Sequence, residues 1–580
     1  MCGIIGYIGK NNPIDILING LKKLEYRGYD SAGIALKGND IQVIKSVGKI
    51  SNLEDKINNT KLIDSNIGIA HTRWATHGEP NEINAHPHTI GKITLVHNGI
   101  IENAKELKED LENKGVKFNT STDTEVIAGL IDYYYKGNMK EAIENAIKEL
   151  KGSYALAIIN EDEDKLYAVR CESPLILGIS EDGYFVTSDI GAILDYTKKY
   201  VLLGKDEIVC LSKDEYNIIK GDTKVFRKVE VSSLSVEDTG LNGYDHYMMK
   251  EINEEPVLVD HLVKKYIDNL DDLPDISKYK NIHIVGCGSA YYAGMIGKYL
   301  FEEDGIKVEC DVASEYRYRN IIYDKDTLVI LISQSGETAD TIAAMRMANE
   351  KQVDTLAIVN TESSTIDRES TYTVLIEAGK ETAVATTKAF VLQVLILSLL
   401  SYKINKDDKY IEDIRKLPQQ LKVLLDKTGF YKKLADSIYK HEDVFFIGRK
   451  VDYAISMEGS LKLKEVSYIH SDSYQAGELK HGTISLVTDG TIVFAIVTDD
   501  SIRDKTISNL EEVISRGAKP IYVGNVDVDY ENKIIIPKIH PKLQPILAVA
   551  PLQMIAYFVA LKRGCDIDKP KNLAKSVTVE

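Results

Sequence analysis

The second half of the chain contains two copies of one strand-and-helix pattern. After about residue 243, buried apolar strands alternate with long helical stretches, which is typical of a doubly wound parallel sheet. Three apolar strands recur in the same order after 163 to 165 residues: 282–286 and 445–448, 327–332 and 491–496, 355–359 and 520–523. This repeat predicts two tandem α/β domains, at 243–425 and 426–565, followed by a C-terminal tail at 566–580.

The first 225 residues have a different pattern. Short β-branched strands such as 3–8 alternate with polar turns, and helical stretches lie near 13–25 and 123–136. This mixture predicts an α+β sandwich. The charged, weakly periodic stretch 226–242 is interpreted as a linker. A length of 580 residues agrees with several domains of about 150 residues each.

The composition excludes several partners and compartments. The net charge of −17 argues against non-specific binding to nucleic acid or to an anionic membrane. The longest apolar runs, 389–400 and 546–561, are shorter than the ~20 residues of a membrane span and are predicted to be buried helices. The six cysteines form no CxxC pair and no zinc-ligand spacing, and the N-terminus has no signal pattern. We therefore predict a cytoplasmic protein without a metal, a cofactor, a nucleic-acid partner or a membrane.

Cys2 is a candidate N-terminal nucleophile. Its small side chain permits removal of Met1, which leaves a free α-amine on the residue that carries the thiol. An α-amine has a pKa of about 7.7–8.0, so it can act as the general base for that thiol. The MCGI context alone leaves open an ordinary cysteine in a strand.

Polar residues downstream supply what an acyl-transfer site needs. The Asn98 side chain and the Gly99 backbone amide are two donors for a developing oxyanion. Arg73 can grip an α-carboxylate and Asp123 can take an α-ammonium, so free glutamine would be held at both of its ends. The histidines within 71–97 leave a metal site open, although none has HxxxH or CxxC spacing.

These residues lie in a series of ordered motifs. MCGIIGYIG, EYRGYDSAGIA, HTRWATHGEPN, AHPH, HNGIIEN and STDTEV follow one another through residues 1–225. In this order they resemble the class II, N-terminal-nucleophile glutamine amidotransferases. The resemblance implies that Thr76 and His77 also bind glutamine, and that Trp74 gates an internal ammonia channel.

The turn Ser333–Thr338 is a candidate phosphate site. Its sequence, SQSGET, follows an apolar strand and opens a helix, so its hydroxyls and backbone amides would face an anion at the helix N-terminus. A Ser-rich turn that only caps the helix is the alternative. The turns at 286–289 and 384–388 are weaker signals of the same kind.

A predicted helix near 453–468 carries acid–base groups on one face. Glu458, Lys462 and Glu465 fall at i, i+4 and i+7. They place a base beside a cation, although helical salt bridges alone would explain the same spacing. His481 adds a side chain of the type that titrates near neutrality.

The end of the chain completes a second resemblance. With DHYMMKEINEEP and NLAKSVTVE, these segments resemble the paired sugar-isomerase domains of the glucosamine-6-phosphate synthase family, over essentially the whole chain. The resemblance implies a sugar phosphate bound by Ser333, Gln334, Ser335 and Thr338, and a pocket lined by Ser289, Val384, Thr386 and Ala574. The tail at 566–580 would close this sugar site.

The same resemblance implies a role for each acid–base residue. Glu465 would move a proton between C1 and C2 of the sugar, with Glu458 and Lys462 in support. His481 would assist ring opening from the neighbouring subunit, which implies a homodimer or a larger assembly. Lys575 would form an imine with the open-chain ketose, a reaction that needs a partly desolvated amine.

The expected reaction joins the two halves of the chain. Cys2 would hydrolyse L-glutamine, and the ammonia would convert fructose 6-phosphate into glucosamine 6-phosphate, the first step of amino-sugar synthesis. A few residues depart from those usual in the family: Ser289 and Ala290 replace Thr-Ser, Thr386 replaces Ser, Lys571 replaces Arg and Glu255 replaces Gln.

Two other functions stay open at this point. The acidic segment 497–501 resembles the diphosphate loop of a phosphoribosyl-pyrophosphate amidotransferase, but no Gly-Thr follows it and the tandem repeat would go unexplained. A sensor that binds a sugar phosphate without turnover would need neither Cys2 nor Lys575.

Overall fold

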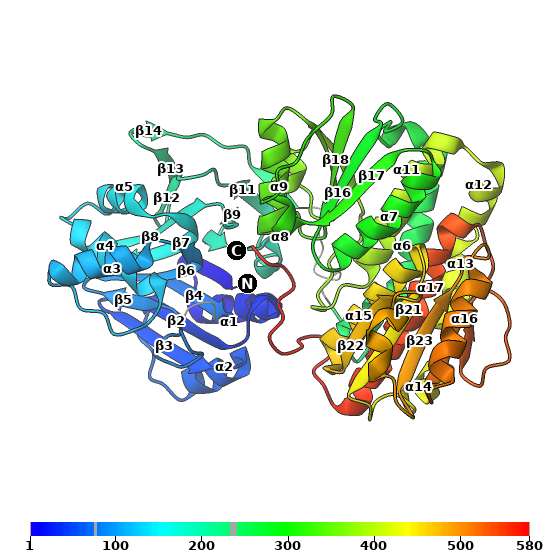
Figure 1. Cartoon of the computed structure of the whole chain (residues 1–580). Coiled ribbons are helices and arrows are strands. Elements are labelled where there is room, and N and C mark those ends of the chain that lie inside the picture. The colour runs from blue at the N-terminus through cyan, green and yellow to red at the C-terminus, as the bar shows by residue number, and fades with distance from the viewer. Residues whose placement is uncertain (1, 75–77, 233–239, 579–580) are drawn as a thin grey trace. The chain divides into compact units, whose positions relative to one another are not determined.

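The computed structural model describes residues 2–74, 78–232 and 240–578 (Figure 1). The chain divides into two compact units, one reaching to Gly240 and including Ser576–Glu580, the other running from Leu241 to Lys575. The predictions for Met1, Thr76 and His77 lie outside the described residues.

The first unit contains two antiparallel sheets. One has the order β15 (Glu230–Val231), β11 (Lys199–Leu202), β9 (Ile176–Ile179), β10 (Gly183–Thr187), β1 (Gly3–Gly9), β4 (Ile67–Arg73), β2 (Ser31–Lys37) and β3 (Ile41–Val47). The other has the order β14 (Thr223–Lys224), β13 (Tyr216–Lys220), β12 (Ile208–Leu211), β8 (Glu163–Cys171), β7 (Gly152–Asn160), β6 (Ile93–Ile101) and β5 (His88–Ile90). Ile4 and Ile69 from one sheet share a buried core with Val96 and Ala157 from the other. The two sheets therefore pack face to face.

Helices cover the outer faces of these sheets. They are α1 (Pro13–Leu24) and α2 (Ile50–Asn58) on the first sheet, and α3 (Ala104–Asn113), α4 (Asp123–Tyr134) and α5 (Met139–Glu149) on the second. The start of α1 follows from its sequence, because the Asn12 side chain accepts a hydrogen bond from the Ile14 amide and Pro13 occupies the first turn. The layers confirm the predicted α+β sandwich.

The second unit contains two parallel sheets with the same strand order. The first is β17 (Lys307–Val312), β16 (Asn281–Gly286), β18 (Thr327–Ser333), β19 (Asp354–Val359) and β20 (Tyr372–Leu375). The second is β22 (His470–Gln475), β21 (Asp443–Gly448), β23 (Ile492–Val497), β24 (Lys519–Gly524) and β25 (Lys533–Ile535). All neighbouring strands in both sheets run parallel. The repeat predicted from the spacing of apolar strands is thus confirmed as two tandem α/β sheets.

Helices flank these sheets and connect them. The first repeat has α6 (Tyr247–Asp268), α7 (Ser289–Glu303), α8 (Ala313–Tyr316), α9 (Ala339–Glu350), α10 (Thr365–Glu369) and α11 (Lys388–Asn405). They are followed by α12 (Asp408–Ile414), α13 (Leu417–Leu425), α14 (Thr428–Ala435), α15 (Val451–Ser467), α16 (Arg503–Ile514) and α17 (Gln544–Arg563). In both repeats the helix after the first strand, α7 or α15, begins a few residues beyond a glycine, Gly286 or Gly448.

Two apolar helices lie at the centre of the second unit. The segments Lys388–Asn405 and Pro541–Arg563 are long and apolar enough to cross a membrane by length and composition, yet 78% and 100% of their apolar windows are buried inside the protein. One core cluster contains α11, α17 and strands of both parallel sheets. The two apolar runs are therefore core helices, as predicted.

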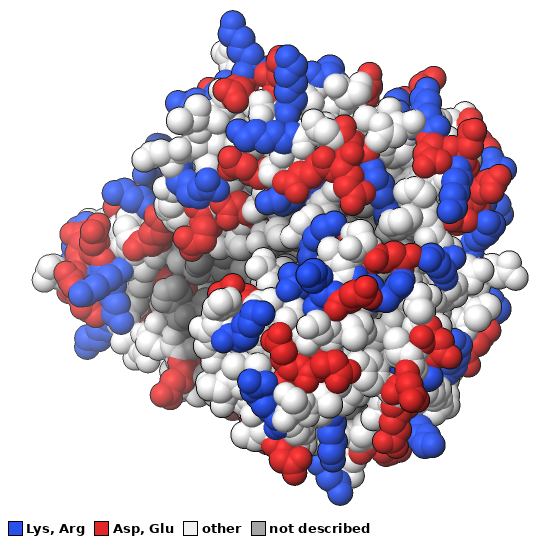
Figure 2. Space-filling model, turned by 45° about the vertical axis from the view of Figure 1, so that its right-hand side comes forward, with Lys and Arg blue, Asp and Glu red and all other residues white. Residues whose placement is uncertain are grey.

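The surface carries both signs of charge. Figure 2 shows one face, on which Lys and Arg side chains lie interspersed with Asp and Glu side chains. A mixed surface with a net charge of −17 offers little attraction to a polyanion.

Candidate active sites

Cys2 lies half-buried at the start of β1. The backbone N–H of Trp74 donates to its sulfur over 3.3 Å, and the thiol lies 3.5 Å from the Trp74 carbonyl oxygen. Burial raises the pKa of the Cys2 thiol. A neutral thiol is a weak nucleophile, so this cysteine needs a base close by, as the N-terminal-amine hypothesis supposes.

Asn98 is oriented toward Cys2 from strand β6. Its side-chain Nδ2 donates to the carbonyl oxygen of Cys2 over 2.9 Å, while the Nε2 atom of His71 lies 3.1 Å from its Oδ1. An amide oxygen only accepts, so His71 donates there and fixes which end of the Asn98 amide faces Cys2. The next residue, Gly99, has φ 136°, and a Cβ atom there would lie 2.0 Å from the Ser153 carbonyl oxygen. Only glycine fits.

Predicted residues of the glutamine site that the structure describes line one small cavity. Cys2, Arg73, Trp74, Gly99 and Asp123 are among the residues around its volume of about 20 Å³. Arg73 ends β4, and Asp123 begins α4, where its carboxylate accepts a hydrogen bond from the Ile101 amide over 3.0 Å. The structure thus brings together residues from four separate sequence motifs. Their contacts with glutamine stay predictions.

Buried histidines lie in and beside this cavity. Burial lowers the pKa of His71 to about 3, and also lowers the pKa values of His86 and His88 well below their ordinary range. The Nδ1 atom of His86 lies 3.1 Å from the Nε2 atom of His71. Among the described residues, no three His, Cys, Asp or Glu side chains are arranged to hold a metal ion. Of these imidazoles, His71 contacts Asn98 and His86 contacts His71, whereas the Nε2 atom of His88 lies 3.3 Å from the Thr122 hydroxyl.

The predicted phosphate turn lies where strand β18 ends. Ser333 is the last strand residue, and α9 begins at Ala339. The Ser333 hydroxyl lies 3.0 Å from the Thr338 hydroxyl and accepts a hydrogen bond from the Gly336 amide over 3.0 Å. The strand–turn–helix context is as predicted. In open α/β sheets this carboxyl end of the strands is where ligands bind.

A second group of polar residues lies on α15. Lys462 is fully buried, with its Nζ 2.6 Å from Glu465 and 3.5 Å from Glu458. Although burial opposes a charged lysine, the two carboxylates raise its pKa. Burial raises the pKa of Glu458 to about 7, and Ser289 from the first repeat donates to the Glu458 carboxylate over 3.1 Å. Residues of both repeats therefore meet here.

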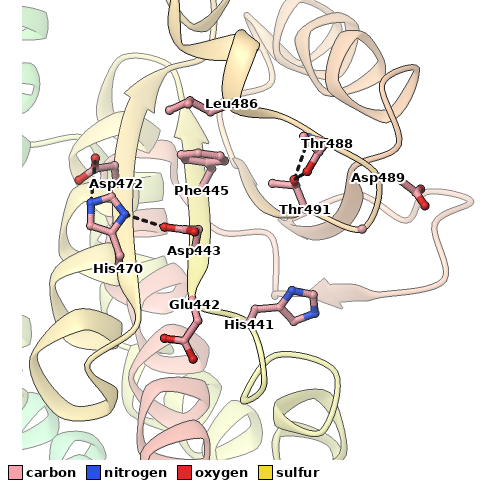
Figure 3. A pocket seen from close by; sticks show the side chains of 11 residues that line it. His441, Glu442, Asp443, Phe445, His470, Asp472, Leu486, Thr488, Asp489 and Thr491 are labelled. Atoms are coloured by element: carbon pink, nitrogen blue, oxygen red, sulfur yellow. Dashed lines mark hydrogen bonds and ion pairs between the residues drawn. The ribbon is translucent and has the colours of Figure 1, made fainter.

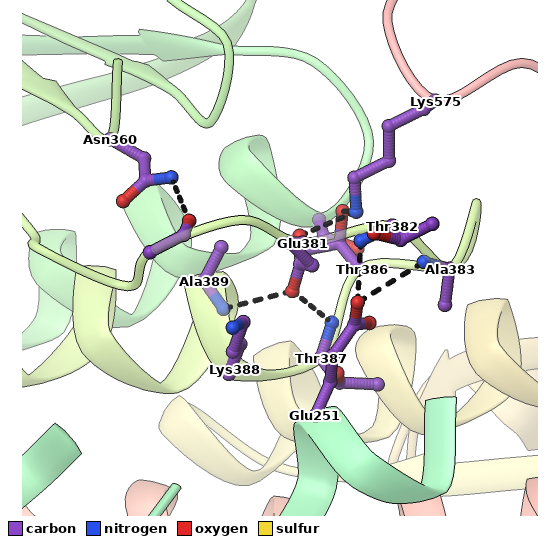
Figure 4. A network of polar contacts seen from close by, with 12 residues as sticks. Glu251, Asn360, Glu381, Thr382, Ala383, Thr386, Thr387, Lys388, Ala389 and Lys575 are labelled. Carbon is purple, nitrogen blue, oxygen red and sulfur yellow. Dashed lines mark hydrogen bonds and ion pairs between the residues drawn. The ribbon is translucent and has the colours of Figure 1, made fainter. Parts of the chain in front are cut away.

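Lys575 reaches a buried carboxylate that the sequence analysis did not single out. Its Nζ lies 2.5 Å from Glu381 Oε2 and 3.4 Å from the Thr386 hydroxyl. Figure 4 shows Lys575 pointing toward Glu381. The Lys575 side chain is 3% exposed and that of Glu381 is fully buried. Val384 connects the same loop to the C-terminal segment, because its amide donates to the carbonyl oxygen of Asp568 over 3.0 Å.

Two protein-family models match the chain. The glutamine amidotransferase domain matches residues 71–195, and the SIS domain matches residues 275–402 and again 437–563. The isomerising glutamine–fructose-6-phosphate aminotransferases of Clostridium tetani and Methanosarcina acetivorans are 46% and 43% identical to this chain. Each comparison covers 100% of this chain and 100% of the relative. The chain belongs to the isomerising glutamine–fructose-6-phosphate aminotransferase family.

Solved structures agree with this placement. The C-terminal domain of glucosamine-fructose-6-phosphate aminotransferase from Francisella tularensis is 35% identical, with a TM-score of 0.54, and covers 57% of this chain and 100% of its own. An Escherichia coli tagatose-6-phosphate ketose/aldose isomerase, at 17% identity and TM-score 0.51, shows the same fold. The resemblance inferred from the sequence motifs is confirmed.

In this family member His481 lies exposed at the end of the 3₁₀ turn Leu479–His481. Its predicted role in a neighbouring subunit's site is not tested by one chain. Ala574 directly precedes Lys575 and is partly buried. Glu381 was missed because a single Glu in a polar loop gives no periodic signal. The run of Thr residues after it, ending at the start of α11, was the available clue.

A larger cleft lies away from these residues. It measures about 370 Å³ and is lined by His441, Asp443, His470, Asp472 and Leu486, among others (Figure 3). Asp443 and His470 begin strands β21 and β22, so the cleft lies at the amino ends of the strands, opposite to the end where such sheets bind ligands. We therefore do not assign it to the aminotransferase chemistry.

Proposed function

We propose that this enzyme releases ammonia from L-glutamine at Cys2 and uses it to convert fructose 6-phosphate into glucosamine 6-phosphate. The observation that carries this proposal is the presence of two sites in one chain. Cys2, Arg73 and Asp123 surround one cavity, and the sugar-isomerase unit contains a lysine, Lys575, that is buried against a carboxylate. Full-length relatives that share both halves carry the corresponding enzyme name.

The first half of the reaction uses Cys2. Its α-amine takes the thiol proton, and the sulfur attacks the side-chain amide carbon of glutamine. The oxygen that becomes negative is stabilised by the Asn98 side chain, which already reaches the Cys2 backbone, and by the Gly99 amide. Ammonia leaves, and water then releases glutamate from the thioester. Arg73 and Asp123 hold the α-carboxylate and α-ammonium of the substrate.

The second half uses Lys575 and Glu465. The turn Ser333–Thr338 holds the phosphate, and Lys575 forms an imine with C2 of the open-chain ketose. Ammonia replaces Lys575 on that carbon. Glu465, held by Lys462 over 2.6 Å, then takes a proton from C1 and returns it to C2, which yields the amino aldose. Ser289, Gln334, Val384 and Ala574 line the pocket.

We also propose that the enzyme works as a cytoplasmic homodimer or larger assembly. All six cysteines are unpaired, which suits a reducing compartment. The exposed position of His481 leaves it available to a neighbouring subunit. Light scattering and the activity of mixed His481→Ala and Lys575→Ala dimers test this point, because shared sites would restore part of the activity in mixtures.

One assay separates this function from its rivals. The purified protein is incubated with glutamine and either fructose 6-phosphate or phosphoribosyl pyrophosphate, and glutamate and glucosamine 6-phosphate are measured. We expect amino sugar with fructose 6-phosphate. Glutamate release stimulated only by phosphoribosyl pyrophosphate would refute the proposal. Binding of fructose 6-phosphate without any amino sugar would identify a sensor instead.

A further inference from the structure

The buried carboxylate of Glu381 is fixed from two sides. Its Oε1 accepts hydrogen bonds from the backbone amides of Thr387 and Ala389, over 3.0 and 3.1 Å, where α11 begins. Its Oε2 contacts Lys575 (Figure 4). The amides at the N-terminus of an 18-residue helix favour a negative charge at this point. Glu381 therefore presents one oxygen to Lys575 in a fixed direction.

Glu381 holds its negative charge while a neighbouring carboxyl group stays protonated. Burial alone would raise the pKa of Glu381, but the charge of Lys575 and the hydrogen bonds bring it below its ordinary value. For Glu251, burial and then the charge of Glu381 raise the pKa to about 8. Glu251 accepts hydrogen bonds from the amides of Thr382 and Ala383. Below about pH 8, Lys575 thus faces a single negative charge.

Other charged groups around this pair are paired with one another or lie on the neighbouring helices. Lys388 contacts Glu254 over 2.7 Å, so it does not compete for Glu381. The charged and titratable groups whose fields reach Glu381 or Glu251 include Tyr247 and Glu255 from α6, Lys388 from α11, Lys462 from α15 and Lys575. Lys462 is already held by Glu458 and Glu465.

The reaction of a lysine with a ketone conserves this charge. A protonated amine and a ketone give a protonated imine and water, so three N–H protons become one N–H and two protons of the released water. The ammonium gives up one proton when its nitrogen attacks the ketone and a proton is returned as water leaves, so the nitrogen is positively charged before and after the reaction. The remaining N–H is the one that a fixed carboxylate oxygen 2.5 Å away is placed to accept.

We propose that Glu381 is the counterion of the protonated imine that Lys575 forms with the open-chain ketose, an inference that rests on the proposed role of Lys575. Glu381 holds the imine in its protonated form, which is the form that ammonia attacks. The fixed oxygen also sets the direction of the C=N bond relative to the Thr386 hydroxyl.

Trapping of the imine at several pH values tests this inference. The full-length protein is incubated with fructose 6-phosphate and sodium cyanoborohydride, and the fraction of Lys575 reduced to a secondary amine is measured by peptide mass spectrometry. In Glu381→Gln the imine loses its counter-charge and gives up its proton at lower pH. We expect trapping within about threefold of the wild type at pH 6 and at least about tenfold below it at pH 7.5, where Glu251 is still mostly protonated in the wild type, in line with a counter-charge worth more than one pKa unit.

Asp568→Asn is the matched control. Asp568 also caps a helix in this unit, because its carboxylate accepts the Tyr247 and Met248 amides at the start of α6, over 2.8 and 2.9 Å. We expect this variant to be trapped like the wild type at each pH. Glu381→Asp keeps the negative charge on a shorter side chain. We therefore expect its trapping yield to be lower than that of the wild type but to follow the same pH profile. This variant replaces Glu381→Gln if that protein does not fold.

The outcomes separate the inference from the proposed function. If the wild type is trapped on Lys575 and Glu381→Gln is reduced by the same factor at every pH, Glu381 only positions the tail and the counterion role is refuted. The counterion role is also refuted if the trapping yield of Glu381→Asp, relative to the wild type, falls as pH rises. If the wild type makes amino sugar but is never trapped on Lys575, the imine assignment itself fails, and the counterion role with it.

Discussion

Replacing Lys575 by Met removes the positive half of a fully buried ion pair. The two charged atoms are 2.5 Å apart, and the side chains are 3% and 0% exposed. At an effective dielectric constant of 20, two charges at this distance attract by about 7 kcal/mol, which sets a ceiling. Breaking a buried pair usually costs about 3–5 kcal/mol. The Thr387 and Ala389 amides continue to bind Glu381. We therefore expect Lys575→Met to lower the free energy of unfolding by about 3–5 kcal/mol.

The loss should depend on pH. In the wild type the pKa of Glu381 is lowered, so the pair stabilises the fold above the unfolded pKa of about 4.5 and this contribution is lost on acidification. In Lys575→Met burial raises the pKa of Glu381, so stability is lost as pH rises instead. The two proteins should therefore differ most at pH 8 and approach each other only below pH 4.5, as pH falls through the lowered pKa of Glu381.

The assay is scanning calorimetry of the full-length protein at pH 5 and pH 8. A glutamine-site ligand that raises the transition of the first unit identifies that transition, so the other belongs to the second unit. Lys575→Met/Glu381→Gln should recover most of the lost stability, because no buried charge is left unpaired. Equal melting of Lys575→Met and the wild type at pH 8 would refute the reasoning, as would a double variant no more stable than the single one.

Three further substitutions test the two sites and the buried carboxyl groups. Cys2→Ala should abolish glutamate release while Lys575 is still trapped by cyanoborohydride with fructose 6-phosphate; loss of both would contradict separate sites. For Asp452, burial raises the pKa from 3.8 to about 6, so the stability of Asp452→Asn relative to the wild type should rise by about 3 kcal/mol between pH 3.8 and pH 6. A stability gain independent of pH in calorimetry would contradict this. For Glu255, burial raises the pKa well above 4.5. The melting temperature of Glu255→Gln should therefore be higher than that of the wild type at pH 8 and equal to it near pH 4. A lower melting temperature at pH 8 would count against a protonated Glu255.

The apolar pattern predicted most of the second unit. Central strands such as β18 and β23 are buried on both faces, so their sequences are almost continuously apolar and easily recognised. Strand β22, with the sequence HSDSYQ, was missed because it lies at a sheet edge, where pairing with β21 and not side-chain burial holds it. Similarly, β15 lies within the expected linker and is held by β11.

The candidate sites were predictable where the chemistry itself restricts residue type. A nucleophile, an oxyanion donor and an imine-forming lysine each require particular side chains, and ordered motifs surround Cys2, Asn98 and Lys575. Supporting residues such as Glu381 and His71 act through contacts between distant segments. Glu381 and Lys575 are 194 positions apart, so no local pattern links them.

The shared strand order of the two parallel sheets gives the chain two equivalent turns, one after β18 and one after β23. In the first, Ser333 and Thr338 present hydroxyls. In the second, the carboxylate of Asp452 already accepts the backbone amides of Thr498 and Asp499. The duplicated fold thus carries its own anion in the second turn, fixed by covalent attachment. A phosphate that binds at the first turn, as proposed, would therefore find the corresponding amides of the second turn already occupied by Asp452.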